Sequence, residues 1–187
     1  MITRGTPPSP PQAWPSAEEE RHVFFKCQVP SFVLDRFNVT LSNNIFVKAG
    51  AVTDGHADGA LRSAAPNALN GWHASFAMRG NIIVSAGPAP IFSPGSDAQW
   101  ALSTFDHNVY WLAGGGATLF PDDQDLEAWQ KVGCKGGELG GQDKHSALAD
   151  PRFKDAAHHD FTLLPSSPAL KLGFRQVDMS TVGPRRV

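Results

Sequence analysis

Three segments of the chain repeat one pattern of apolar and polar positions around an asparagine. They are VTLSNNIFV, FAMRGNIIV and STFDHNVYW, and they place Asn44, Asn81 and Asn108 at equivalent positions. Apolar residues alternate with other residues on both sides of each asparagine, and only Ser103 departs from this pattern. Period-two alternation is typical of a β-strand with one buried face. Each segment is therefore predicted to form a strand, a corner and a second strand.

The repeated corner predicts a stacked architecture. Asparagine tolerates the left-handed backbone region, so it can turn the chain at one residue, and stacked asparagines can bond from one unit to the next. The spacing between the asparagines falls within the ~20 to 45 residues of one solenoid coil. The predicted fold class is all-β: a right-handed parallel β-helix (solenoid) with a short C-terminal helix and an irregular capping segment. Unrelated strands of a β-sandwich are the alternative, although a sandwich does not require the same residue at each corner.

The chain divides into an arm and one domain. Residues 1–31 are Pro-rich and are expected to be partly disordered, with a docked segment around Phe24. Residues 32–187 are expected to form the β-helix domain, with coils over about 37–120 and a C-terminal capping subdomain over about 121–187.

The capping subdomain begins with a predicted helix. In PDDQDLEAWQKVG, the acids up to Asp125 can cap the start, Gly133 can end the helix, and Leu126 and Trp129 would face the core. The SPAL sequence is interpreted as an edge that cannot add a further strand. Acids and histidines are frequent between Asp143 and Asp160, and turn chemistry is the favoured explanation for them, with an acid–base or metal cluster as the alternative.

Composition supports short strands joined by turns and narrows the functional classes. The 187 residues include 18 Gly and 15 Pro, and charged residues make up 18%. The net charge of -2 gives no electrostatic basis for binding nucleic acid or a membrane surface. Two cysteines, Cys27 and Cys134, leave the disulfide state open. The sequence contains neither an apolar run of ~20 residues nor a visible signal peptide.

The order of several motifs resembles one protein family. DHNVYW, DLEAWQ, GQDKHSALADPRF, DFTLLPSSPALKLGF and VDMSTVGP follow the repeated corners, between about Phe37 and Pro184. They resemble the C-terminal end of right-handed parallel β-helix (pectate-lyase-like) carbohydrate-active proteins. The resemblance implies part of a glycoside hydrolase-like enzyme that acts on polysaccharide or oligosaccharide, in a secreted or periplasmic parent protein. A polysaccharide lyase and a non-catalytic capping or carbohydrate-binding segment are the alternatives.

Family members carry more coils before this region, where this chain has the Pro-rich arm. The chain is therefore expected to be N-terminally truncated, with an exposed first coil through which copies can self-associate.

Asp106 is the candidate catalytic carboxylate. Phe105 and Val109 should point inward, so Asp106 should point outward, and an outward acid beside an aromatic suits a sugar site. The alternative is that Asp106 only bonds the corner backbone. A lyase would instead use a base such as Arg79 or Lys48. The candidate substrate-binding residues are His107, Tyr110, Trp111, Trp72, Asp143 and His145.

A possible calcium site is the one cofactor expectation. Asp54, His56 and Asp58 alternate with small residues, so an extended loop would project them to one side. Asp54 and Asp58 are the candidate metal ligands, with calcium as the ion. A solvated Gly-rich loop is the simpler alternative.

Overall fold

The computed structural model describes the parts of the chain that hold the repeated segments and the C-terminal region. The described residues are 17–20, 23–25, 32–34, 39–48, 61–63, 76–85, 103–115, 120–133 and 140–178. The predicted metal ligands Asp54 and Asp58, Trp72 and both cysteines lie outside these ranges.

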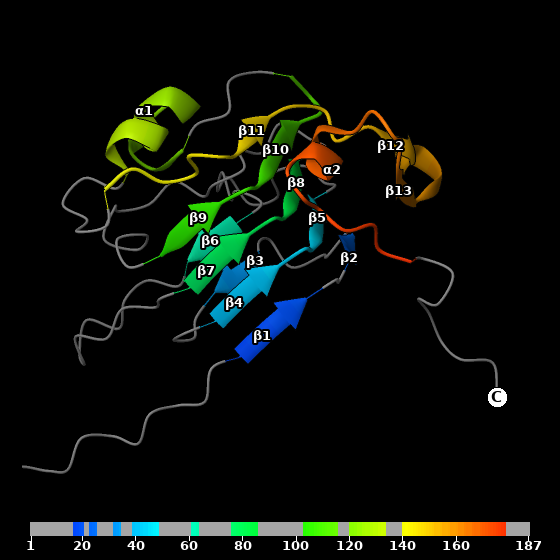
Figure 1. Ribbon diagram of the computed structural model, residues 1–187, viewed down its shortest axis with the longest axis horizontal. Helices are drawn as coiled ribbons and strands as arrows, with labels where there is room; N and C mark the ends of the chain where they lie inside the picture. Colours follow the sequence, from blue (N-terminus) through cyan, green and yellow to red (C-terminus); the bar gives the residue numbers. More distant parts are fainter. Residues whose placement is uncertain are drawn as a thin grey trace, which may run out of the picture.

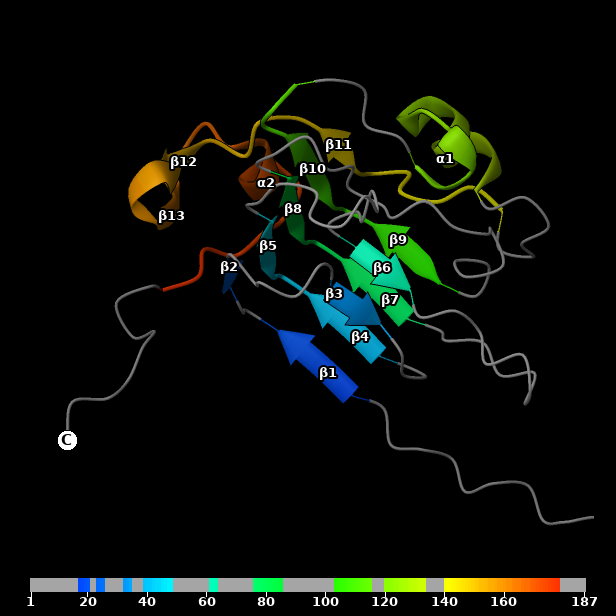
Figure 2. The ribbon, with the colours of Figure 1, turned by 180° about the vertical axis from the view of Figure 1, so that it is seen from behind.

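The first halves of the repeated segments form one parallel sheet, called sheet A. Its strand order is β1 (Ala17–Glu20), β4 (Val39–Ser42), β7 (Phe76–Arg79) and β9 (Thr104–Asp106). These strands lie side by side in Figure 1 and, seen from behind, in Figure 2. Leu41 pairs with Met78 and Met78 with Phe105, so one buried apolar column runs across the sheet.

The second halves form sheet B, which is also parallel. Its order is β11 (Ala147–Leu148), β10 (Val109–Leu112), β8 (Ile82–Ser85), β5 (Ile45–Lys48) and β2 (Val23–Phe25). Ile45, Ile82 and Val109 pair in register and are at most 1% exposed. Burying one such side chain contributes about 1.5–3 kcal/mol, so this column is a major part of the core. Strands β3 (Phe32–Leu34) and β6 (Leu61–Ser63) form a separate parallel pair.

Two strands fall within the segment predicted as an arm. β1 pairs with β4 at the edge of sheet A, and β2 pairs with β5 at the edge of sheet B, with Phe24 opposite Phe46. The segment around Phe24 is therefore docked, as expected.

The asparagine corners stack, as the sequence predicts. The backbone N–H of Asn44 donates to the Oδ1 of Asn81 at 3.0 Å, and that of Asn81 donates to the Oδ1 of Asn108 at 2.9 Å. The Nδ2 of Asn81 in turn donates to the carbonyl of Leu41. The next unit changes residue type, because the N–H of Asn108 donates to the Oγ of Ser146 at 2.8 Å. A side-chain oxygen from the next unit therefore accepts the backbone N–H of Asn44, Asn81 and Asn108 in turn.

The residue that turns each corner is not the one predicted. Positive φ angles occur one position earlier, at Asn43 (54°), Gly80 (63°) and His107 (58°). The stacked asparagine follows this residue and acts through its side chain. The sequence-based expectation that Asn44, Asn81 and Asn108 themselves adopt the left-handed region is therefore wrong.

The prediction of an all-β solenoid is also wrong. The parallel sheets are accompanied by the antiparallel pair β12 (Phe153–Asp155) and β13 (Asp160–Leu163) and by two helices, α1 (Leu126–Val132) and α2 (Pro168–Lys171). The described residues thus make a mixed α/β arrangement. The cause lies after Phe120, where helix caps and tight turns replace the repeated strand pattern. Two short 3₁₀ turns, Pro121–Asp123 and Ala156–His158, belong to the same region.

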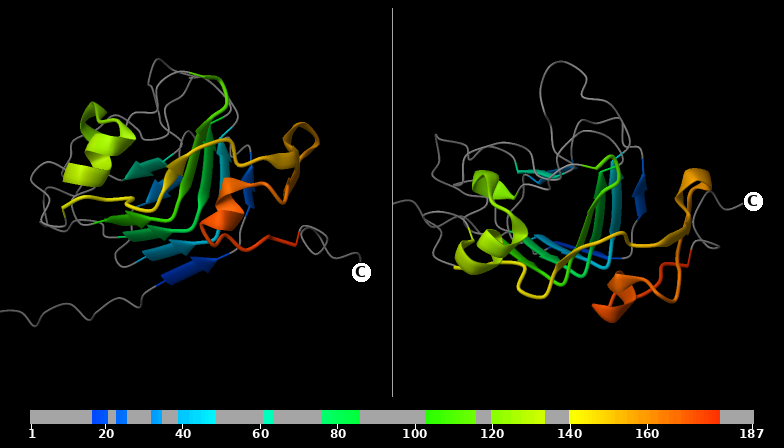
Figure 3. Two further views of the ribbon diagram at one scale, coloured as in Figure 1. Left: turned by 45° about the horizontal axis from the view of Figure 1, so that its top comes forward. Right: turned by 90° about the horizontal axis from the view of Figure 1, so that it is seen from above.

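Helix α1 forms as its caps predict. The side chain of Asp125 accepts from the N–H of Ala128, and Gly133 ends the helix with a φ of 70°. Trp129 is fully buried and stacks on Phe120. In Figures 1 and 3, α1 lies beside the β9 end of the sheets. Neither α1 nor any other helix within the described residues has the length and apolar character needed to span a membrane.

The prediction for SPAL is wrong. Ser167 caps the helix α2 through its side chain, and Pro168 occupies the first turn, where its missing N–H is not needed. Ala169 of α2 then joins the core cluster that contains Ile45, Ile82 and Val109. SPAL therefore starts a helix over the core rather than ending a sheet.

Candidate functional site

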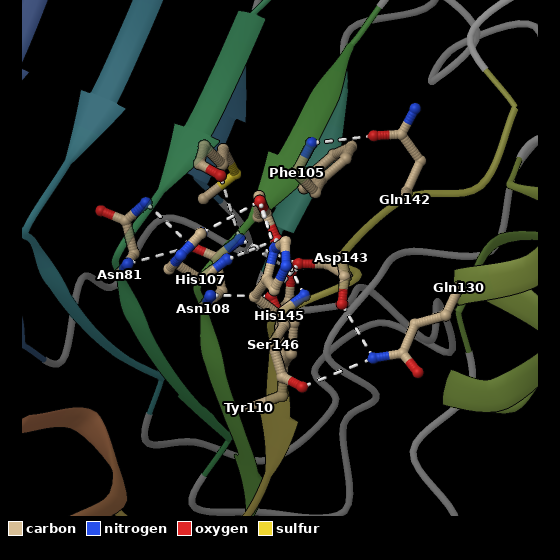
Figure 4. A network of polar contacts seen from close by, with 12 residues as sticks. Asn81, Phe105, His107, Asn108, Tyr110, Gln130, Gln142, Asp143, His145 and Ser146 are labelled. Atoms are coloured by element: carbon tan, nitrogen blue, oxygen red, sulfur yellow. Dashed lines mark hydrogen bonds and ion pairs between the residues drawn. The ribbon is translucent and has the colours of Figure 1, made fainter. Parts of the chain in front are cut away.

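A polar cluster lies at the corner where sheet A passes into sheet B. Asp106 is the last residue of β9, and His107, which follows it, forms the corner. His145 comes two residues before β11, and Figure 4 shows it near His107. Phe105 is buried, whereas Asp106 is half-buried, so the alternation of β9 turns the carboxylate outward as predicted.

The register of sheet B explains why two distant histidines meet. Val109 of β10 pairs with Ala147 of β11. His107 and His145 each stand two residues before these partners, so they occupy equivalent positions in successive units. Their ring centroids are 4.8 Å apart, with an interplanar angle of 34°.

Asp106 binds both histidines. The Nδ1 of His145 lies 3.0 Å from Oδ2 and 3.2 Å from Oδ1, and the backbone N–H of His145 donates to Oδ1 at 2.9 Å. The backbone N–H of His107 also donates to Oδ1, at 3.0 Å. The Nδ1 of His107 lies 3.0 Å from Oδ2, yet this nitrogen makes no hydrogen bond with any described residue because the angle is unsuitable.

These contacts keep Asp106 ionised. Partial burial raises its pKa, but the hydrogen bonds from the His145 side chain, the His145 backbone and the His107 backbone outweigh that effect and hold the pKa below its ordinary value. An ionised carboxylate only accepts hydrogen bonds, so the proton in the contact with His145 belongs to Nδ1. The His145 side chain is 62% exposed, against 31% for His107.

A second carboxylate, Asp143, supports the cluster from inside the protein. It is fully buried and accepts hydrogen bonds from the Nδ2 of Asn108 at 3.0 Å, the hydroxyl of Tyr110 at 2.9 Å and the Nε1 of Trp129 at 2.8 Å, as well as from Ser146. Burial raises the pKa of Asp143, although these bonds to its charged form oppose the rise. Asp143 thereby fixes the turn that carries His145.

The predicted site residues fall into three groups. Asp106, His107 and His145 come together at the surface, while Asp143 lies beneath them and is inaccessible. Of the other candidates, Tyr110 is buried and Trp111 packs against the core cluster, whereas Trp72, Asp54 and Asp58 lie outside the described residues.

The outward orientation predicted for Tyr110 is wrong. The side chain is 0% exposed, its hydroxyl donates to Asp143, and its ring packs edge-on against Phe120. Burial, followed by the charge of Asp143, raises the pKa of Tyr110 well above its ordinary value, so the phenol stays protonated. No stacking surface for a sugar is offered by this ring.

Sequence reasoning missed the fourth corner. Residues 145–148, HSAL, occupy the places that HNVY occupies at residues 107–110, with Ser146 in place of the asparagine. The shared histidine and the small polar residue after it are the signal that would have paired His145 with His107.

The cluster offers an ionised carboxylate and two imidazoles on a solvent-facing corner, which suits proton transfer or metal binding. Two further acids, Asp150 and Asp160, have the role in turns that the sequence predicts. Asp150 accepts from the N–H of Arg152, and Asp160 accepts from that of Thr162.

In comparisons with known proteins, no family model, no curated protein and no solved structure matches this chain.

Proposed function

We propose that the chain acts on a carbohydrate polymer and that the Asp106–His145 pair transfers a proton in the reaction. The observation that carries the proposal is the contact of the His145 Nδ1 with both oxygens of an ionised carboxylate. The substrate class is supported by the resemblance of the corner motifs to pectate-lyase-like carbohydrate-active proteins.

The pair has the arrangement of an oriented general base. With its Nδ1–H held by Asp106, a neutral His145 has a lone pair on Nε2, which no described residue contacts by a hydrogen bond. That nitrogen can accept a proton, and Asp106 then stabilises the imidazolium that forms. The 62% exposure of the His145 side chain leaves room for a substrate to approach.

Elimination fits this site better than hydrolysis by two carboxylates. Hydrolysis needs two accessible carboxyl groups about 5 to 10 Å apart, and the second carboxylate of this site, Asp143, is fully buried. In an elimination, His145 would take the proton from a sugar carbon next to a carboxylate. A carbon–carbon double bond would form, and the glycosidic oxygen would leave and gain a proton from solvent.

Arg79 supplies a reason to expect an acidic polymer. It is exposed on β7 and stands in register with Asp106 on the neighbouring strand. A guanidinium on the strand next to Asp106 can bind the carboxylate of a uronic acid residue through two hydrogen bonds. The proposed substrate is therefore a uronic-acid-containing polysaccharide.

The test is an activity assay of chelator-treated protein with neutral and acidic polysaccharides as substrates. Products are measured as reducing ends and as the ultraviolet absorbance of unsaturated sugars. The wild type is expected to release unsaturated products from an acidic polymer. Asp106→Asn and His145→Gln should lower the rate at least a hundredfold, as expected for loss of general-base catalysis.

His158→Gln is the matched control, because His158 forms a similar exposed pair with Asp155 at 2.7 Å. This variant should keep the wild-type rate. Reducing ends without unsaturated products would contradict elimination. Absence of any product from every polymer would contradict the catalytic proposal and favour a non-catalytic binding or capping role.

A further inference from the structure

The three side chains of the surface cluster present their donor atoms to one another unusually closely. One ligand atom from each of Asp106, His107 and His145 lies within 4.8 Å of the other two. The Oδ2 of Asp106 is 3.0 Å from the Nδ1 of each histidine. Neighbouring ligands in a tetrahedral zinc site lie about 3.3 Å apart, since each is about 2.0–2.2 Å from the ion. The two oxygen–nitrogen distances are therefore close to the spacing of ligands around one ion, and all three ligand atoms lie within 4.8 Å of one another.

His107 provides an independent observation. Its Nδ1 atom has under 1 Å² of exposed surface and no hydrogen bond with any described residue, although it lies 3.0 Å from a carboxylate oxygen. A nitrogen lone pair facing a carboxylate is repelled unless a positive charge lies between them. A proton on this nitrogen lacks the angle for a good hydrogen bond, whereas a metal ion requires only the lone pair.

We propose that Asp106, His107 and His145 bind one first-row divalent transition ion, with Zn²⁺ as the fitting example, through Oδ2 and the two Nδ1 atoms. Imidazole nitrogen is a good ligand for zinc and a poor one for the hard ions Ca²⁺ and Mg²⁺. Three protein ligands leave a fourth position open on the side where His145 is exposed.

The fold supports this site in two ways. The αL corner holds His107 in place, and the buried Asp143 fixes the turn before His145 through the bond from the Ser146 N–H to the Asp143 carbonyl, at 2.9 Å. The site is thus largely formed before an ion arrives.

Metal binding does not depend on the proposed carbohydrate activity, and the two uses of His145 exclude each other. The ion would take the Nδ1 lone pair that exists only after the proton shared with Asp106 has left. Zinc should therefore block proton transfer by the Asp106–His145 pair. The activity assay avoids this inhibition because the protein is first treated with a chelator.

The experiment is calorimetric titration of the chelator-treated, untagged full chain with Zn²⁺, with Mg²⁺ and Ca²⁺ as comparison ions. Visible absorption of bound Co²⁺ reports the coordination directly. The wild type is expected to bind one Zn²⁺ tightly, with neither comparison ion competing at equal concentration.

Two substitutions remove single ligands with little cost to folding. His107→Asn places at this corner the residue that Asn43 supplies, at nearly the same φ, in another unit. His145→Gln changes an exposed side chain. Each should weaken Zn²⁺ binding at least tenfold and abolish the Co²⁺ spectrum, while circular dichroism stays unchanged.

His158→Gln is again the control, because neither Asp155 nor His158 belongs to the three-residue cluster. It should bind Zn²⁺ as the wild type does. The proposal is overturned if the wild type does not bind Zn²⁺, if His107→Asn binds it unchanged, or if His158→Gln loses as much affinity as His107→Asn.

Discussion

Truncating the central asparagine of the stack, Asn81→Ala, tests whether the corners hold the two sheets together. The Asn81 side chain is 1% exposed. It accepts from the backbone N–H and Nδ2 of Asn44 and donates to the carbonyl of Leu41 at 2.9 Å and to the Oδ1 of Asn108 at 3.2 Å. Alanine removes all of these bonds and leaves a cavity too polar to collapse favourably.

The expected cost follows from the two backbone groups. Losing the partner of a buried backbone N–H or carbonyl costs about 1–3 kcal/mol. Asn44 and Leu41 are both buried, so Asn81→Ala should lower the free energy of unfolding by about 2–6 kcal/mol. Small domains have total stabilities of about 5–15 kcal/mol, so the variant should be severely destabilised.

Urea denaturation followed by far-ultraviolet circular dichroism measures this change through the transition midpoint. Ser103→Ala is the matched control, since the buried Ser103 hydroxyl makes no hydrogen bond with a described residue. That control should be neutral or slightly stabilising. A loss below about 1 kcal/mol for Asn81→Ala, or equal losses in both variants, would refute the role given to the stacked amides.

Three further predictions concern the C-terminal region. Asp125→Ala removes the side-chain acceptor for the N–H of Ala128 and should cost about 0.5–2 kcal/mol in urea denaturation; an unchanged midpoint would contradict the cap. Gly133→Ala should fold poorly, as judged by soluble yield, because a Cβ there would lie 2.0 Å from the carbonyl oxygen of Gly140; normal yield and stability would contradict this contact. Asp160→Asn tests pH dependence: the side-chain and backbone hydrogen bonds from Thr162 lower the pKa of Asp160 below 3.8. The ionised Asp160 carboxylate therefore stabilises the folded protein above pH 3.8, and this stabilisation is lost as the pH falls through the lowered pKa. The difference in stability between the wild type and Asp160→Asn should shrink at acidic pH and stay constant when the pH is raised.

The repeated segments were predictable because their information is local. Period-two alternation fixes which side chains of β4, β7 and β9 face the core, and a shared asparagine fixes the corner. Helix α1 was predictable for the same reason, since Asp125 and Gly133 act on neighbouring backbone groups. Each of these features depends on residues a few positions apart.

The features that the sequence did not predict depend on distant contacts. Tyr110 follows the alternation of β10 poorly because Asp143, thirty-three positions later, binds its hydroxyl inside the protein. At the first corner, Asn43 and Asn44 both suit a turn, and distant partners separate their roles: the side chain of Asn43 bonds the backbone of Arg175, and the N–H of Asn44 bonds Asn81. The contact of His145 with Asp106 likewise requires the register between β10 and β11.

Among candidate site residues, the sequence identified the members without their arrangement. Asp106, His107 and His145 were each singled out, but only the stacking of the third and fourth corners makes them one cluster. The mixed α/β character was missed because the C-terminal region was expected to hold one short helix and an irregular capping segment, with SPAL at a sheet edge. Ser167 and Pro168 instead begin a helix that contributes to the core.

The left-handed conformation at His107 has an energetic consequence of its own. A residue with a Cβ loses about 1–2 kcal/mol in this region relative to glycine, and the equivalent position in the preceding unit is Gly80. His107→Gly should therefore raise the melting temperature while it removes the imidazole from the surface. Under laboratory selection for heat resistance alone, His107 is expected to be replaced. If His107 is retained under selection for activity, the protein keeps a less stable residue at that corner because its function requires the imidazole.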